Sequence, residues 1–299
     1  MSYSAEISRS NPSCFVFLID QSGSMQDLLD PTTGQGLDKS QSADGKSYTQ
    51  ASQGRTKAQG VADAVNKLLS NLVIKCAKEE GIRDYYYVGV IGYGATVGPC
   101  FGGALSGKQL ASISEIGNNP TRVDVRSRKV DDGAGGLIDQ QIKFPIWFDP
   151  TSSGGTPMEQ ALAEATTILQ GWLGQHPGCF PPIVINITDG EADQSTNPAA
   201  AADQLRSLAG TDGNVLLFNI HVSSMKAAPI EFADSENGLP DKFAQQLFRM
   251  SSPLPAYMRT IAQQEGYNVS EATRGFSFNA DMVALIKFLD IGTRPSNLR

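Results

Sequence analysis

The strongest constraint on the fold is a set of four apolar segments, at residues 14–20, 85–97, 181–190 and 214–223. In each segment most of the apolar residues run together instead of alternating with polar ones. Continuously apolar strands are typical of a sheet that is covered on both faces, and strands that alternate with helices favour parallel pairing. We therefore expect an α/β fold with a doubly wound, mostly parallel sheet and helices on both faces.

Two of the segments between these strands have the spacing of amphipathic helices. The apolar face of the first consists of Ala58, Val61, Ala62, Val65, Leu68, Leu69 and Leu72. The second opens at Thr156-Pro157, where we expect Thr156 to be the N-cap and Pro157 the first helical residue. Its apolar face consists of Met158, Ala161, Leu162, Ala165, Ile168, Leu169 and Trp172. The pattern also predicts helices near 198–208, 242–250, 257–266 and 282–289, and a short strand at 275–279.

No linker divides the chain, so we expect one domain over residues 1–299 with insertions at about 28–55, 99–150 and 224–255. The first insertion is rich in Gly, Ser, Thr, Asp and Gln, which is typical of a surface loop. Inside the second, two strand-like segments flank the glycine-rich residues 131–136, which predicts a hairpin.

Composition excludes several functions. The chain has 299 residues, of which 40% are hydrophobic and 18% charged, with a formal net charge of -7. The basic residues form no stripe, which argues against a nucleic-acid partner. No segment approaches the roughly 20 apolar residues of a membrane span, so no membrane contact is expected. Four cysteines without metal or redox spacing, and an N-terminus without the apolar region of a signal peptide, favour a cytoplasmic location.

Polar residues gather where the predicted strands end. Asp20 ends the first strand, and Ser22 and Ser24 follow it at alternate positions; Asp189 ends another strand, and Thr156 lies in a Gly-Gly-Thr-Pro turn. The carboxyl ends of strands are where ligands bind in open α/β sheets. Two carboxylates and three hydroxyls are hard oxygen ligands, which suit Mg²⁺, Mn²⁺ or Ca²⁺ and not zinc or copper.

The sequence Asp-Gln-Ser-Gly-Ser-Met at residues 20–25 resembles the Asp-x-Ser-x-Ser motif of von Willebrand factor A (vWA) domains. Gly-Gly-Thr-Pro-Met at 154–158 and Ile-Thr-Asp-Gly at 187–190 are similar to the segments that carry this family's metal-site Thr and second Asp. The resemblance covers roughly residues 12–223. It implies an intact metal-ion-dependent adhesion site (MIDAS) made of Asp20, Ser22, Ser24, Thr156 and Asp189. A further carboxylate, Asp27, lies beyond the turn, and we expect it not to coordinate.

The resemblance implies a protein-binding module, not an enzyme, in which a bound Mg²⁺ (or Mn²⁺ or Ca²⁺) captures a Glu or Asp of a partner protein. The chain is similar to intracellular bacterial vWA proteins, which often work beside ATPases, kinases or phosphatases in stress-response assemblies. Two alternatives stay open: a Mg²⁺-dependent phosphohydrolase with Asp20 as nucleophile, and a scaffold with a structural metal. Against the first, Ser22 stands where phosphatases of the haloacid dehalogenase type need a second Asp as acid and base.

Other motif-like residues have simpler interpretations. Gly92, Gly94 and Gly98 do not have the spacing of a dinucleotide fingerprint and instead indicate bulges or a hairpin bend in the second strand. His221 lies inside an apolar strand, where we expect it to pack and not to catalyse. The aromatic residues at the end of the second insertion are expected to pack it onto the body of the domain: Phe144, Trp147 and Phe148.

Overall fold

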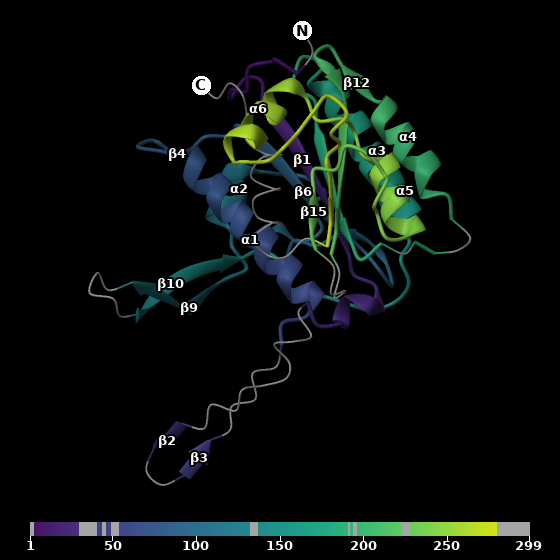
Figure 1. Cartoon of the computed structure of the whole chain (residues 1–299). Helices are drawn as coiled ribbons and strands as arrows, with labels where there is room; N and C mark the ends of the chain where they lie inside the picture. The colour runs from purple at the N-terminus through teal and green to yellow at the C-terminus, as the bar shows by residue number, and fades with distance from the viewer. Residues whose placement is uncertain are drawn as a thin grey trace.

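The computed structural model describes residues 3–29, 41–43, 46–48, 54–131, 137–190, 192–193, 196–222 and 228–279. The centre of the fold is an eight-stranded sheet (Figure 1). Its strands are β1 (Ser13–Asp20), β6 (Tyr86–Tyr93), β7 (Val97–Pro99), β8 (Ala111–Ser112), β11 (Ile183–Thr188), β14 (Leu216–His221), β15 (Ile230–Glu231) and β16 (Phe276–Phe278).

The strand order is β15-β16-β14-β11-β1-β6-β7, and β8 pairs with β6 outside this path. The strands from β6 through β1, β11 and β14 to β16 are parallel, and β7, β8 and β15 are antiparallel to their neighbours. The predicted doubly wound, mostly parallel α/β sheet is confirmed. The order reverses between β1 and β11, and the crevice outside the carboxyl ends of two such strands is where these folds bind ligands.

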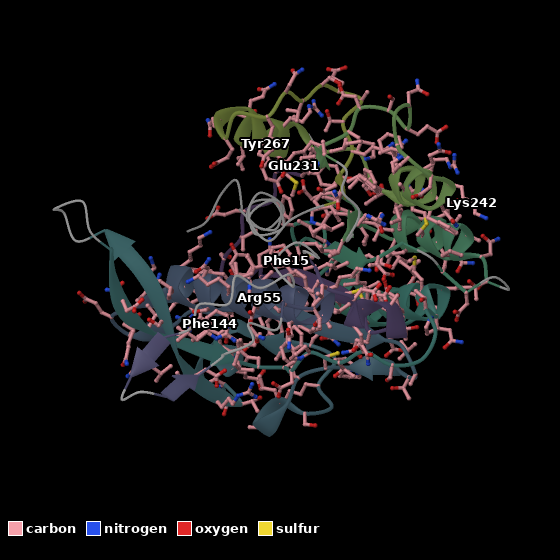
Figure 2. All side chains as sticks on the ribbon, turned by 60° about the horizontal axis from the view of Figure 1, so that its bottom comes forward. Phe15, Arg55, Phe144, Glu231, Lys242 and Tyr267 are labelled. Atoms are coloured by element: carbon pink, nitrogen blue, oxygen red, sulfur yellow. The ribbon has the colours of Figure 1, made fainter. Side chains whose placement is uncertain are left out.

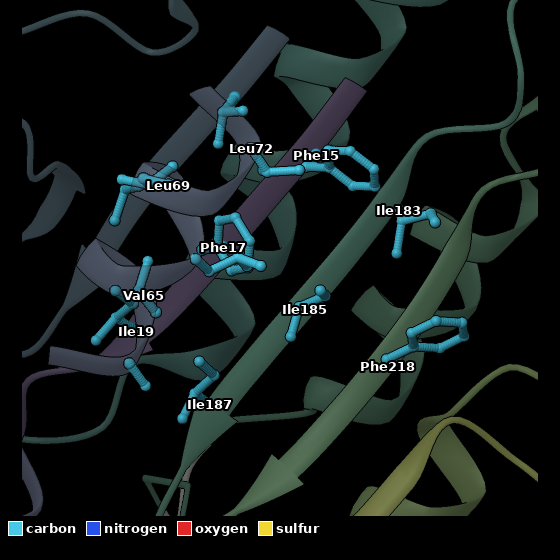
Figure 3. Packing of buried hydrophobic residues seen from close by; sticks show 14 of the residues in the cluster. Phe15, Phe17, Ile19, Val65, Leu69, Leu72, Ile183, Ile185, Ile187 and Phe218 are labelled. Atoms are coloured by element: carbon cyan, nitrogen blue, oxygen red, sulfur yellow. The ribbon is translucent and has the colours of Figure 1, made fainter. Parts of the chain in front are cut away.

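Side chains of β1 enter two separate cores, one on each face of the sheet, because successive strand residues point to opposite sides. Phe15, Phe17 and Ile19 pack against helix α1 (Lys57–Cys76), as Figure 3 shows. The residues between them face helix α3 (Met158–Gln175). Burial of each large apolar side chain contributes about 1.5–3 kcal/mol, so both cores hold the central strand in place.

The remaining helices complete the two layers. Residues of α2 (Ile113–Asn118) and α6 (Ala256–Gln264) join the core on the α1 face, and residues of α4 (Pro198–Ser207) and α5 (Lys242–Met250) join the core on the α3 face. All the predicted apolar positions of α1 and α3 are buried. The predicted helix at 282–289 lies outside the described residues. Among the described helices, none combines the length and apolar character that crossing a membrane requires.

The two helices that frame the site begin differently. Thr56 caps α1: its hydroxyl accepts the Gln59 backbone N–H, and the Gln59 side chain accepts the Thr56 N–H. The predicted cap of α3 is wrong, because its N-cap is Pro157 and the helix begins at Met158. The reason is that Pro157 has φ -75° and ψ 56°, and the Met158 N–H donates to the Thr156 carbonyl over 2.8 Å, so Pro157 forms a tight turn and is not the first helical residue.

The hairpin predicted in the second insertion is confirmed. Strands β9 (Arg122–Asp131) and β10 (Leu137–Ile146) pair antiparallel and extend away from the central sheet in Figure 1. The aromatic residues at its base are buried as expected: Phe144, Trp147 and Phe148. Asn66 of α1 ties this segment to the body, since it accepts the Trp147 N–H and donates to the Phe148 carbonyl.

A pocket of about 480 Å³ lies between α1 and this hairpin, on the side where Figure 2 labels Arg55 and Phe144. Its lining includes arginines, but Arg55 and Arg126 both pair with Asp63, at 3.3 and 2.8 Å. The guanidinium of Arg126 also stacks on the Phe144 ring. The third lining arginine, Arg122, pairs with Asp124 and Asp149. Because each arginine has an acidic partner, the pocket supports the packing of the hairpin more than it supports capture of an anion.

Short elements make up the rest of the described chain. The first insertion contains a small hairpin of β2 (Gln41–Ala43) and β3 (Lys46–Tyr48) where a loop was predicted, and the third contains α5 as predicted. The other minor elements are η1 (Gly23–Gln26), β4 (Ala77–Lys78), β5 (Gly81–Ile82), η2 (Gly103–Leu105), β12 (Ala209–Gly210) and β13 (Gly213–Asn214). The four cysteines are unpaired, and His221 is buried and stacked on Phe278, as a packing role requires.

Candidate metal site

The site starts from Asp20, the last residue of β1, whose side chain is fully buried. Its Oδ1 accepts the backbone N–H of Ser22 over 2.8 Å, and its Oδ2 accepts the hydroxyl of Thr188 over 2.7 Å. Thr188 ends β11, one residue past the paired Ile19 and Ile187. The carboxylate is therefore fixed between the two central strands, at the point where the strand order reverses.

Burial raises the pKa of the Asp20 carboxyl from 3.8 to about 6. The hydrogen bonds from Ser22 and Thr188 lower this pKa, and the negative charge of Asp189 raises it further. A carboxylate that is costly to ionise in the folded protein would gain from a cation placed beside it. The position of Asp20 thus fits a cation-binding role.

The loop after β1 lies against the loop that carries Thr156. The Gly23 N–H donates to the Gly154 carbonyl over 3.1 Å, and the Ser153 N–H donates to the Gln21 carbonyl over 2.6 Å. The hydroxyls of Ser22 and Ser24 are 3.0 Å apart and hydrogen-bonded, so these alternate side chains face each other as the sequence spacing predicts. The structure therefore joins the first two of the three motif segments directly.

Gly94, in the bend between β6 and β7, allows these two loops to approach each other. The expected hairpin bend is confirmed, since Gly92 and Gly98 pair across it. The neighbouring Ala95 N–H donates to the Ser153 carbonyl over 2.8 Å. A Cβ atom on Gly94 would lie 2.6 Å from both the Gln21 and the Ser153 carbonyl oxygens. From the sequence, Gly94 could be predicted only as a glycine in or near a strand. Its role in the site depends on the close approach of the Gln21 and Ser153 carbonyls.

Asp189, which follows β11, forms an ion pair with Lys57 that no motif in the sequence predicted. The ammonium Nζ of Lys57 lies 3.2 Å from Asp189 Oδ2, 3.3 Å from Asp27 Oδ2 and 3.4 Å from the Ser24 carbonyl. Lys57 is only 5% exposed. Asp27, which was expected not to coordinate, contacts this lysine, and its own side chain is 63% exposed.

The predicted ligands thus come from loops and strand ends that contact one another. Among the described residues, no group of three or more His, Cys, Asp or Glu side chains could hold a metal by itself. A metal ion here would depend on the combined set of two carboxylates and three hydroxyls, which suits a hard divalent cation. The assignment of Asp20, Ser22, Ser24, Thr156 and Asp189 as ligands stays a prediction.

Neither models of known protein families nor curated proteins match the chain. Among solved structures, it is similar to a manganese-loaded TRAP protein of Plasmodium vivax, with 16% identity, a TM-score of 0.39 and coverage of 97% of this chain and 77% of that chain. It is also similar to proximal thread matrix protein 1 of the mussel byssus, whose MIDAS motif holds zinc, with 14% identity, a TM-score of 0.43 and coverage of 96% and 49%.

A further similar structure is the vWF domain of the type V pili tip protein Mfa5 from Porphyromonas gingivalis, with 11% identity, a TM-score of 0.27 and coverage of 63% and 43%. This chain spans about half the length of the mussel protein. Because the identities and TM-scores are this low, no ligand or partner of these proteins is assigned to this chain. The resemblance to vWA domains stands on the three motifs and on the mostly parallel sheet whose strand ends carry Asp20 and precede Asp189.

Thr188 gives a first test of the site geometry. Thr188→Val removes the donor to Asp20 Oδ2 and the acceptor of the Gly190 N–H, so the carboxylate loses one of its two fixed contacts. We expect the affinity for Mn²⁺, measured by titration calorimetry, to fall about 10- to 100-fold, as when a residue that orients a metal ligand is removed. Thr188→Ser keeps the hydroxyl and should stay near the wild type. Equal affinity in the Val variant would contradict the assignment of Asp20 as a ligand.

Proposed function

We propose that this protein is a metal-dependent protein-binding module. A divalent cation, for which we favour Mg²⁺ or Mn²⁺ over Ca²⁺, would be held by Asp20, Ser22, Ser24, Thr156 and Asp189. It would bind a Glu or Asp side chain of a partner protein. The observation that carries the proposal is the fully buried carboxylate of Asp20, at the point where the strand order of the sheet reverses. It accepts the Ser22 N–H and the Thr188 hydroxyl, and the hydroxyls of Ser22 and Ser24 follow it in the same loop.

The surface of the site supports capture of a partner over a purely structural metal. Asp20, Ser22 and Thr156 are buried, but Ser24, Gly154 and Gly155 at the rim are exposed. A cation bound between these groups would supply positive charge close to solvent. Mg²⁺ retains several of its waters in protein sites. A carboxylate from outside could replace one of these waters.

The same geometry argues against a phosphohydrolase. A nucleophilic Asp20 would need a carboxylate oxygen free to attack a phosphorus atom. A phosphoryl group is much larger than a metal ion, and the Asp20 side chain has no exposed surface along which such a group could approach. Ser22 donates its backbone N–H to Asp20 and has no carboxylate to serve as acid or base. We therefore propose a binding function without catalysis.

The wider setting is also a proposal. The motif resemblance suggests a partner from an assembly that contains an ATPase, a kinase or a phosphatase, in a bacterial stress response. The cytoplasmic location, the absence of a nucleic-acid partner and the organisation as one domain with three insertions stay predictions from the sequence.

The first test is thermal stability. Divalent metal should raise the melting temperature, because a ligand that binds only the folded state stabilises it by about 2.7 kcal/mol at one hundred times its Kd. Scanning calorimetry in EDTA and in millimolar Mg²⁺ or Mn²⁺ measures this shift. Asp20→Asn, which removes a ligand charge, is the matched control and should show no shift. A wild-type protein that melts identically in EDTA and in each metal would contradict a functional site.

The second test uses a library of displayed random peptides, selected on the protein in Mg²⁺. Peptides that are retained in Mg²⁺ and released by EDTA should contain Asp or Glu. Their binding should be lost with Thr156→Ala, which removes a hydroxyl ligand without changing the charge of the site. Enrichment of peptides that bind equally well in EDTA would contradict the mechanism.

A further inference from the structure

Lys57 is buried at a position where its own charge is unfavourable. Lysine is almost never buried unless its charge is paired. Lys57 is the first residue of α1, and the first turn of a helix is its electrostatically positive end. The side chain is nevertheless only 6% exposed. Its placement therefore depends on the acidic groups that it contacts, Asp27 and Asp189.

The ammonium group of Lys57 has three oxygen neighbours, as many as it has N–H donors. These are Asp189 Oδ2, Asp27 Oδ2 and the Ser24 carbonyl, at 3.2 to 3.4 Å. Charge-assisted hydrogen bonds usually measure about 2.7–2.9 Å, so these contacts are long. Lys57 is thus held by several weak contacts, one of them to a predicted metal ligand, and it can give up one of them without losing all its partners.

The charges of the site then differ from those of two carboxylates alone. Asp20 and Asp189 contribute two negative charges and Lys57 one positive charge, which leaves one net negative charge before metal binds. A divalent cation would change this sum to one net positive charge. Without Lys57 the loaded site would be neutral. Asp27, and Asp193 beside Thr156, each add a negative charge, but both residues are exposed and their charges are screened by water.

We propose that Lys57 is a built-in counter-cation of the metal site. It neutralises Asp189 when no metal is present, releases that carboxylate to an entering divalent cation, and leaves the loaded site positive, so that the ion favours an anionic carboxylate over water. This inference rests on the proposed metal-dependent function. It deepens that function by assigning to one residue both a limit on metal affinity and a preference for acidic partners.

Lys57→Met tests the proposal, since methionine keeps much of the length of the side chain and removes its charge. Its affinity for Mn²⁺, measured by titration calorimetry, should rise by about tenfold or more, because a positive charge a few ångströms from the ion is removed. In EDTA its melting temperature should fall, because Asp20 and Asp189 then lack their cation. Lys57→Arg keeps the charge and should stay near the wild type. Lys67→Met makes the same exchange at an exposed position of the same helix and should change neither quantity.

The preference for an anion has its own readout. Acetate is the probe, and Mn²⁺ broadens the proton signals of any acetate that binds to it. Acetate should be broadened less by Mn²⁺-loaded Lys57→Met than by the loaded wild type at equal site occupancy. Equal broadening would overturn the part of the proposal that concerns partner preference.

The outcomes separate this inference from the proposed function. Wild type and variants that all bind Mn²⁺ with the same affinity would overturn the role of Lys57 and leave the metal site intact. Failure of the wild type and all variants to bind Mn²⁺ would overturn both. If Lys57→Met does not fold, Lys57→Gln replaces it, since its amide can still donate to Asp189 without a charge; affinity no tighter than in the wild type would again overturn the proposal.

Discussion

Asp20→Asn is expected to abolish metal binding and, in EDTA at neutral pH, to increase the free energy of unfolding by up to about 3 kcal/mol. Burial raises the pKa of the Asp20 carboxyl from 3.8 to about 6, so the folded protein pays for holding this group ionised. Asparagine keeps the shape of the side chain, and its carbonyl can still accept the Ser22 N–H. Chemical denaturation of both proteins in EDTA measures the difference. A variant that is less stable than the wild type at neutral pH would contradict it.

The same pKa predicts a pH dependence with a defined sign. The folded protein binds the Asp20 proton more tightly than the unfolded chain does, so this group stabilises the fold most at low pH. Its contribution should be lost as pH rises from about 4 to about 6 and should then stay constant. Because other carboxylates titrate in the same range, the quantity to measure is the stability difference between wild type and Asp20→Asn. A difference that does not change over this range would contradict the raised pKa.

Asp189→Asn should also abolish metal binding but should change stability in the opposite direction. It removes the negative charge that pairs with the buried Lys57 ammonium, which keeps Asp27 as its remaining charged partner. Breaking a buried ion pair typically costs about 3–5 kcal/mol, and the remaining Asp27 contact should keep the loss below that range. The two predicted ligands of one ion are thus distinguished by their metal-free stabilities, measured in the same denaturation experiment.

Gly94→Ala is also expected to have a large effect, although it changes none of the predicted ligands. The added Cβ would lie 2.6 Å from the backbone carbonyls of Gln21 and Ser153, neither of which can rotate away as a side chain would. Overpacking of this kind costs about 1–3 kcal/mol. It should also separate the loop of Ser22 from the loop of Thr156, so the affinity for Mn²⁺ should fall about tenfold or more, as when ligand positioning is lost.

Gly98→Ala is the matched control for this substitution. Gly98 lies in the same hairpin, and a Cβ atom there would meet nothing within 4 Å. Calorimetric titration and thermal denaturation of both variants should show a loss only for Gly94→Ala. A Gly94→Ala protein with wild-type stability and metal affinity would show that the two loops do not depend on this close approach.

The sheet could be predicted from the sequence because its central strands are continuously apolar and long. The edge strands could not: β7, β8 and β15 are only two or three residues long, too short to show a periodic pattern. The predicted start of α3 was wrong for a different reason. Its local sequence fits a Thr cap, but Pro157 lies in a tight turn closed by the Met158 N–H and the Thr156 carbonyl, which moves the first helical residue to Met158.

The candidate ligands could be predicted from motifs because each lies at the end of a predicted strand or in a predicted turn. The residues around them could not. Thr188 reaches Asp20 only because of the register between β1 and β11, and Lys57 reaches Asp189 only because α1 begins beside the loop after β1. Such contacts join residues that are more than 100 positions apart, and no local pattern in the chain reports them.

The most direct test of the metal site is the anomalous diffraction of crystals soaked in Mn²⁺. The proposed function predicts one anomalous peak beside the hydroxyls of Ser22 and Ser24, at coordination distances of about 2 Å, with Asp20, Thr156 and Asp189 bound to the ion directly or through water. The peak should be absent from Asp20→Asn crystals treated in the same way. A wild-type crystal with no peak at these residues, or with a peak only elsewhere on the protein, would contradict the site and the binding function built on it.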